Sequence, residues 1–176
     1  MTARERRLRM TTGLAIIALG SNQGDARRQV REAIGRLAEL SAAPLRVSSL
    51  WETSPVDCPP GSPPFVNAVV ALTPLPAESP ESLLAKLQDL EKAFGRKPKR
   101  VLNEPRPLDL DLIAFGAERR QSPGLTLPHP RAHLRRFVLA PLAEIVPDLV
   151  LPGQTQTVAQ LLAALRSDEQ IRKISG

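Results

Sequence analysis

Apolar residues recur along this chain with two different periods. In four segments they alternate with polar residues or run without interruption, which is typical of strands. In two other segments they return at every third or fourth position, which is typical of helices, and Asp25 and Ser79 stand where the N-caps of those helices are expected. The predicted elements are, in order, a strand over 14–20, a helix over 25–40, strands over 45–53 and 65–73, a helix over 80–94 and a strand over 106–116.

The order of these elements is β-α-β-β-α-β, the split βαβ arrangement. We therefore expect the α+β class, with a ferredoxin-like βαββαβ sheet and helices packed on it. The pattern after residue 130 predicts additional C-terminal helical segments. Enzymes, metal carriers and RNA-binding proteins all use this topology, so the fold alone does not decide the function.

The last predicted strand contains two carboxylates, in the sequence RPLDLDLIAFG. Alternate residues of a strand share a face, so Asp109 and Asp111 project together, opposite to Leu108, Leu110 and Leu112. Ionised carboxylates in an apolar strand are costly unless they are paired or hold a metal. Taken alone, such a pair is more often a solvated or salt-bridged strand face than a metal site. The pattern nevertheless predicts a cationic partner.

Composition and charge narrow the classes of function. The chain has 176 residues, 42% of them hydrophobic, and we expect one domain over 13–176 after a disordered basic leader over 1–12. The net charge of +6 is confined to that leader and to the segment RKPKRVLNEPR, residues 96–106, which has five basic residues and Glu104. A basic loop that runs directly into two aspartates suits a small polyanion bridged by metal better than a long nucleic acid.

The sequence also indicates the cellular compartment of the protein. No apolar run reaches membrane-spanning length. The apolar segment GLAIIALG ends at GSNQGD rather than at a signal-peptide cleavage site. The single cysteine, Cys58, excludes an internal disulfide and suits a reducing compartment. We expect a cytoplasmic protein with no membrane partner.

Six motifs in order resemble one family, the 6-hydroxymethyl-7,8-dihydropterin pyrophosphokinases. They are ALGSNQGD (18–25), SSLWETSP (48–55), FVNAVV (65–70), LEKAFGR (90–96), PRPLDLDLIAFG (105–116) and LTLPHPRAHLRRFVLAPLAEIVPDL (125–149). The resemblance extends from residue 14 to about residue 152. It implies a transferase that moves pyrophosphate from ATP to the pterin hydroxymethyl group and releases AMP, in folate biosynthesis.

The resemblance also implies residue roles at the phosphates. Asp109 and Asp111 match the pair that holds two magnesium ions, and Mg²⁺ prefers such oxygen ligands together with substrate phosphates. Arg96 and Arg106 match arginines that contact the transferring phosphates, where guanidinium donors stabilise moving charge. These four are the expected catalytic residues. None of the matched side chains is an obvious general base, so we expect in-line attack on the β-phosphorus, helped mainly by positioning and charge stabilisation.

The remaining implied contacts divide between the two substrates. The ATP-binding positions are Gln88, Glu91, Arg96, Lys99, Arg106, Thr126, His129 and Arg135. The pterin-binding positions are Thr53, Pro55, Phe65, Asn67 and Phe137. A flat heteroaromatic ring needs aromatic faces and amide-type hydrogen bonds, and Asn67 shares a strand face with Phe65.

Two other interpretations stay open. The family commonly has RWGPR before its DLD motif, whereas Asn103 and Glu104 replace Trp-Gly here and Pro98 stands at the usual arginine. A relative that binds nucleotide without transfer would fit such a loop. A second alternative is an RNA-binding module, although the aromatic content is 3% and acidic residues on a strand repel phosphate. We expect small-molecule substrates, no nucleic-acid partner and a monomer.

Overall fold

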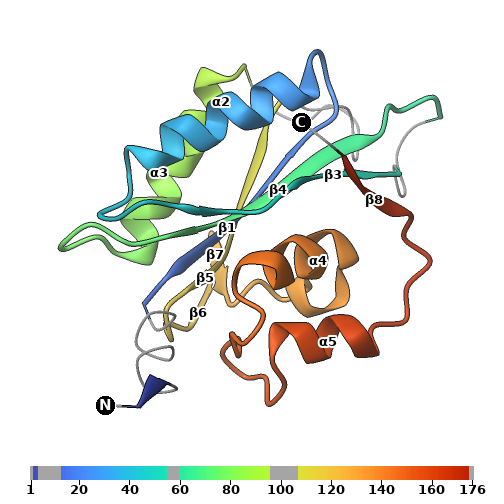
Figure 1. The fold of residues 1–176 in the computed structure, drawn as a ribbon. Helices are drawn as coiled ribbons and strands as arrows, with labels where there is room; N and C mark the ends of the chain where they lie inside the picture. Colours follow the sequence, from blue (N-terminus) through green and yellow to red (C-terminus); the bar gives the residue numbers. More distant parts are fainter. Residues whose placement is uncertain (1, 4–12, 55–59, 96–106, 175–176) are drawn as a thin grey trace.

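Two helical layers enclose one antiparallel sheet in the computed structural model (Figure 1). The structure describes residues 2–3, 13–54, 60–95 and 107–174. Within these ranges the main sheet has the strand order β5-β1-β4-β3-β8, and β2 also pairs with β4. Its strands are β1 (Ala15–Ser21), β2 (Arg46–Val47), β3 (Leu50–Thr53), β4 (Phe65–Leu72), β5 (Asp109–Phe115) and β8 (Ile171–Ile174).

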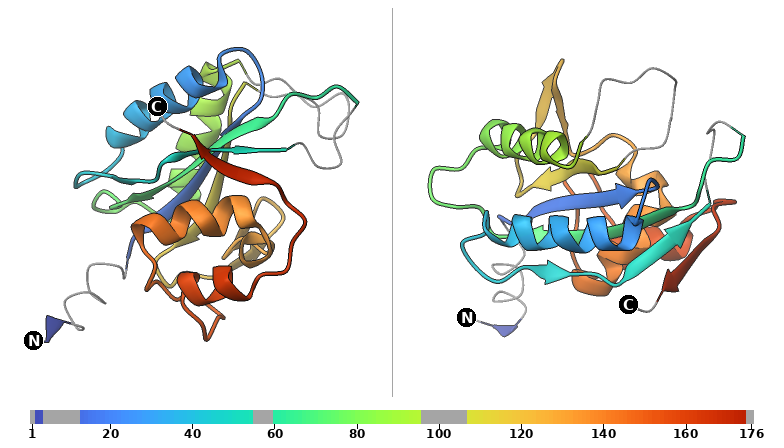
Figure 2. Two further views of the ribbon diagram at one scale, coloured as in Figure 1. Left: turned by 45° about the vertical axis from the view of Figure 1, so that its right-hand side comes forward. Right: turned by 90° about the horizontal axis from the view of Figure 1, so that it is seen from above.

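The helices divide between the two faces of this sheet (Figures 1 and 2). On one face lie α2 (Ala26–Ala38) and α3 (Pro80–Ala93). On the other lie the 3-10 turn η1 (Ala132–Leu134), α4 (Arg136–Ile145) and α5 (Val158–Ala164). A separate hairpin of β6 (Arg120–Ser122) and β7 (Leu125–Leu127) connects β5 to the second helical layer. The ferredoxin-like α+β prediction is therefore confirmed, together with the C-terminal helices.

The sequence explains where helices α2 and α3 begin. The Asp25 side chain accepts a hydrogen bond from the Arg28 amide, and Ser79 accepts one from the Ser82 amide in a reciprocal capping box. Pro80 occupies the first turn of α3, where its missing N–H costs no hydrogen bond. Both predicted N-caps are confirmed, and each satisfies an amide that has no partner inside its helix.

Strand alternation produces two cores, one on each face of the sheet. Leu108, Leu110 and Leu112 pack in the core under α2 and α3, as predicted. Ile113 belongs instead to the core under α4 and α5, and so does Ala114. The two neighbours share a face because the β1–β5 register shifts at this point, which leaves one extra residue in β5.

Part of the sheet departs from the sequence prediction. The strand expected over 45–53 is divided into β2 and β3. At the division the Ser48 amide donates to the Val69 carbonyl at 3.0 Å, while the Ser48 hydroxyl accepts from the Val69 amide at 2.9 Å. The Ser48 hydroxyl thus takes the place of a backbone carbonyl as the acceptor for the Val69 amide of β4. The hairpin β6–β7 and strand β8 were not predicted, because segments of three or four residues have too little periodicity to detect.

In the ranges that the structure describes, none of the helices is both long enough and apolar enough to cross a membrane.

Candidate functional site

One row of residues crosses the sheet on the face toward α4. Asp109 on β5 lies opposite Gly20 on β1, Gly20 lies opposite Asn67 on β4, and Asn67 lies opposite Trp51 on β3. Directly opposed residues of antiparallel strands point to the same side. The acidic strand and the predicted pterin-binding strand are therefore separated only by a glycine, and this row is the centre of the candidate site.

The pterin end of the row is polar and buried. The Asn67 amide nitrogen donates to the Thr53 hydroxyl at 2.8 Å, and both residues are buried. Because the amide nitrogen of Asn67 points toward Thr53 on β3, the amide oxygen points the other way, toward Gly20 on β1. Phe65 lies opposite Thr53 on the paired strand. The structure thus brings together Thr53, Phe65 and Asn67, three of the predicted pterin-binding residues.

Gly20 is a site residue that sequence reasoning missed. A β-carbon at this position would lie 3.0 Å from the Asn67 amide oxygen and 3.8 Å from the Phe65 ring. The glycine therefore lets the amide and the ring lie over the β1 backbone. A glycine inside an otherwise apolar strand was the available signal, since such a residue often marks a close approach by another group.

Asp109 and Asp111 lie half-buried on β5, which is an edge of the sheet. The outward amide of Leu110, between the two aspartates, donates to the Glu91 carboxylate at 2.9 Å. Glu91 is only 8% exposed, so this contact fixes the middle of the acidic strand against α3. The structure therefore places Glu91 on the strand backbone, while Gln88 lies exposed on α3.

His129 joins the acidic strand to the loop before η1. Its amide donates to the Ile113 carbonyl at 2.8 Å, and its Nδ1 accepts from the Arg131 amide at 3.2 Å. Burial lowers the pKa of His129, the nearby charges of Arg135 and Arg131 lower it further, and Asp109 opposes them. The imidazole is therefore biased toward its neutral form, with Nδ1 as an acceptor.

This arrangement predicts a pH dependence centred on His129. Because its pKa is lowered from the ordinary value of 6.5, the folded protein binds this proton more weakly than the unfolded chain. The contribution of His129 to stability is thus complete above pH 6.5 and is lost as the pH falls through the folded pKa. We expect NMR titration of the His129 Cε1 proton to show the lowered pKa, and Arg135→Gln to raise it.

His129→Asn provides the control for this assignment, because the variant has no titrating group at position 129. Its unfolding free energy should fall less steeply between pH 7 and pH 5 than that of the parent. Equal slopes, or an Arg135→Gln protein whose His129 pKa is unchanged, would contradict the assignment.

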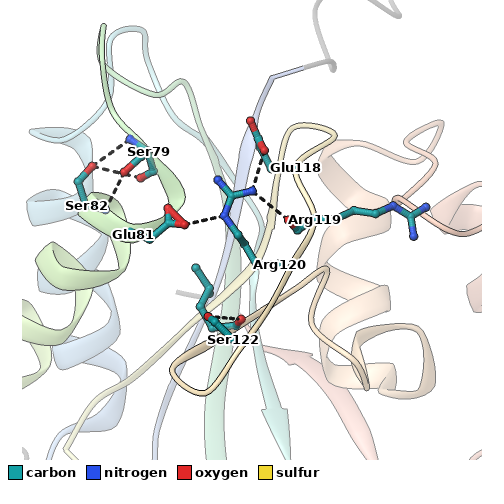
Figure 3. A network of polar contacts seen from close by, with 8 residues as sticks. Ser79, Glu81, Ser82, Glu118, Arg119, Arg120 and Ser122 are labelled. Atoms are coloured by element: carbon teal, nitrogen blue, oxygen red, sulfur yellow. Dashed lines mark hydrogen bonds and ion pairs between the residues drawn. The ribbon is translucent and has the colours of Figure 1, made fainter.

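Thr126 lies exposed on β7, in the hairpin that precedes His129. Arg120 of β6 holds this hairpin to the start of α3, because its Nε contacts the Glu81 carboxylate (Figure 3). Its Nη1 contacts the carboxylate of Glu118, just before β6, at 2.8 Å. The Ser79–Ser82 capping box lies at the same end of α3. The hairpin that carries Thr126 is thus attached to a capped helix.

Phe137 lies half-buried in the first turn of α4, on the side of the sheet where the row lies. The Arg135 guanidinium carbon is 5.4 Å from the centre of the Phe137 ring, a cation–π distance. Arg135, which is predicted to contact the phosphates, therefore lies against Phe137, which is predicted to stack on one face of the pterin. Pro55, Arg96, Lys99 and Arg106 lie outside the described residues.

An open hollow on the protein surface lies away from this row, between α2 and the β2, β3 and β8 strands. It contains none of the residues predicted for the site. The residues that line it are Arg31, Ile34, Val47, Ser48, Ser49, Leu50, Lys173 and Ile174.

Comparison with known proteins places the chain in a family. The model of the 7,8-dihydro-6-hydroxymethylpterin-pyrophosphokinase family matches residues 16–147. The 2-amino-4-hydroxy-6-hydroxymethyldihydropteridine pyrophosphokinase of Haemophilus influenzae is 39% identical over 90% of this chain and 96% of its own length. The enzyme of the same name from Synechocystis is 38% identical over 84% of this chain and 74% of its own.

Solved structures agree at the level of the fold. The wild-type HPPK-DHPS of Plasmodium falciparum, solved with pteroate, superposes with a TM-score of 0.65 at 13% identity. The match covers 87% of this chain and 44% of that one, so the chain spans less than half of that longer protein. The row across the sheet lies within the matched family region, and this chain belongs to the 7,8-dihydro-6-hydroxymethylpterin-pyrophosphokinase family.

Proposed function

We propose that this chain transfers the pyrophosphoryl group of ATP to the hydroxymethyl group of 6-hydroxymethyl-7,8-dihydropterin and releases AMP. The row from Asp109 through Gly20 to Asn67 is the observation that carries this proposal. Two interstrand spacings separate Asp109 from Asn67, about 10 Å in all. That span matches a pterin ring held at one end by an amide, with its hydroxymethyl group toward the acidic strand.

We propose further that Asp109 and Asp111 hold magnesium, as two ions bound together with ATP. Their fit rests on the donor set, since two half-buried carboxylates on one strand face offer the oxygen ligands that Mg²⁺ prefers. Among the residues described in the structure, no group of three or more His, Cys, Asp or Glu side chains could hold a metal ion. In the proposal the remaining ligands are oxygen atoms of phosphate and water, and the metal would orient the triphosphate and neutralise its charge.

In the proposed reaction the pyrophosphoryl group passes directly from ATP to the pterin, without a covalent bond to the protein. The hydroxymethyl oxygen forms a bond to the β-phosphorus and gives up its proton to water, and the bond from this phosphorus to the oxygen shared with the α-phosphate breaks, so that AMP leaves with the electron pair. In the proposal Arg96, Arg106 and Lys99 of the basic segment, with Arg135, stabilise the charge that moves. Positioning supplies the rest, because none of these groups is a general base.

The other predicted residues take supporting roles. In this proposal Thr53, Pro55 and Asn67 bind the pterin edge, and Phe65 and Phe137 stack on its faces. Gln88, Thr126 and His129 contact the nucleotide. Glu91 acts on the nucleotide through β5, because its carboxylate binds the strand backbone between the two aspartates. We propose that the protein acts on small molecules alone, as a cytoplasmic monomer.

The test is to mix the protein with ATP, Mg²⁺ and 6-hydroxymethyl-7,8-dihydropterin and to identify the nucleotide product. AMP formed only when pterin and metal are both present supports the proposal. ADP would mean attack at the γ-phosphorus and a different kinase. Binding of both substrates without any product would mean a nucleotide-binding relative that has lost transfer. A salt-sensitive affinity for RNA that does not depend on ATP would favour the RNA-binding alternative.

A further inference from the structure

Helix α4 receives its N-terminal cap from a distant part of the chain. In the part of the chain that the structure describes, Arg135 at the N-cap makes no side-chain hydrogen bond to this helix. The Glu169 carboxylate instead accepts from the Arg136 amide at 2.8 Å and from the Phe137 amide at 3.3 Å. A carboxylate there satisfies two amides of the first turn and interacts favourably with the helix dipole.

The capped turn is the one that carries predicted site residues. Phe137 is the second residue of α4, and Arg135 directly precedes the helix. Their side chains contact each other at the cation–π distance given above. Glu169 binds the amide of Phe137 itself, whereas the Arg135 amide donates to the Ala132 carbonyl at 3.3 Å.

Glu169 belongs to a segment that is fixed at both ends, residues 165–174, which we name the C-terminal brace. Before Glu169, the Leu165 carbonyl accepts from the Arg136 guanidinium at 3.5 Å. After it, the Gln170 carbonyl accepts from the Ser54 amide at 3.2 Å, and β8 pairs with β3 so that Ile171 lies opposite Thr53. The brace therefore connects the first turn of α4 to the strand that carries Thr53.

A second contact strengthens this connection at the far end of α4. The Lys173 ammonium lies 3.2 Å from the Glu144 carboxylate and 5.4 Å from the centre of the Trp51 ring, while the Trp51 indole N–H donates to Glu144 at 2.7 Å. Figure 1 shows β8 along the outer edge of the sheet beside β3, joined to α5 by the chain that contains Glu169. The family match ends at residue 147, so the brace lies outside the matched region.

We propose that Glu169 is a positioning residue for pterin binding: it sets the place of Phe137 relative to Asn67 and Thr53 without touching the substrate. The proposal rests on the function proposed above. It goes beyond that function because it assigns a part in pterin binding to Glu169, which lies after the region that the family model matches. It also predicts that pterin binding depends on Glu169 far more than ATP binding does.

The experiment measures pterin binding independently of turnover. Trp51 is the only tryptophan of the chain and lies opposite Asn67, so quenching of its fluorescence by 6-hydroxymethyl-7,8-dihydropterin reports occupancy of this end of the site. We expect Glu169→Ala to raise the pterin Kd and KM about tenfold, because the backbone that carries the Phe137 ring loses two hydrogen bonds. The KM for ATP should change less than twofold.

Two further variants separate positioning from simple loss of stability. Glu169→Gln keeps an acceptor oxygen and should recover most of the pterin affinity, and it replaces the alanine variant if that protein does not fold. Asp168→Ala removes the neighbouring exposed acid and should bind pterin like the parent. Thermal unfolding of each protein shows whether affinity merely follows stability.

The outcomes distinguish the two proposals. If the parent protein fails to bind pterin, the proposed function is wrong. If the parent binds pterin but Glu169→Ala binds it equally well, or if pterin and ATP affinities fall by the same factor, the positioning role of Glu169 is overturned. A selective loss of pterin affinity that Glu169→Gln recovers supports it.

Discussion

Asp109→Asn and Asp111→Asn are each expected to reduce pyrophosphoryl transfer by about 10³-fold or more. Asparagine keeps the shape of aspartate but loses the charge that a metal needs from its ligand, and metal-assisted stabilisation of phosphoryl transfer amounts to several kcal/mol. Both side chains are half-buried at a sheet edge, so we expect the folded structure to persist. The measurement is AMP release at saturating ATP and pterin, followed as Mg²⁺ is raised.

The exposed acid Asp89 on α3 supplies the matched control. Asp89→Asn makes the same chemical change near the same strand and should leave the rate within twofold of the parent. If either variant at 109 or 111 reaches nearly the parental rate at saturating Mg²⁺, these carboxylates do not hold the metal.

Gly20→Val is expected to weaken pterin binding by about 100-fold while it leaves ATP binding within a few-fold. The β-carbon alone would approach the Asn67 amide oxygen to 3.0 Å, and valine adds two methyl groups beside the Phe65 ring. The amide must then move away from its hydrogen bond with Thr53, and a binding site whose polar group has moved loses several kcal/mol of recognition. Quenching of Trp51 fluorescence measures the pterin affinity.

Gly35→Ala is the control for this substitution. Gly35 lies in α2, away from the row, and no atom outside the adjoining backbone of this helix lies within 4 Å of the added β-carbon. Alanine is the better helix former, so this variant should bind pterin normally and be slightly more stable than the parent. Unchanged pterin affinity in Gly20→Val would show that the space over Gly20 is not part of the site.

Local patterns predicted the parts of this molecule that are set by neighbours in sequence. The period of apolar residues located four strand regions and two helices, and the two N-caps followed from single residues beside them. The acidic pair could be placed on one strand face because alternation needs only the strand itself. Its assignment to magnesium came from family resemblance and stays a prediction.

The residues that sequence reasoning missed depend on register between distant segments. The role of Gly20 appears only when β4 is aligned beside β1, which places Asn67 opposite it. Glu169 caps a helix that begins 33 residues earlier in the chain. The four-residue strand β8 is defined by its pairing with β3 rather than by its own period. Nothing in the local pattern encodes these alignments, because tertiary packing sets them.

The position of the acidic strand has a consequence for self-association. An edge strand offers unpaired backbone groups to which a strand of another molecule can add, and proteins oppose this with charged side chains and covered amides. At β5 the Leu110 amide already binds Glu91, and Asp109 and Asp111 would bring repelling charge against a second copy of the same edge. The carboxylates proposed for catalysis thus also oppose the pairing of two copies of the protein through β5.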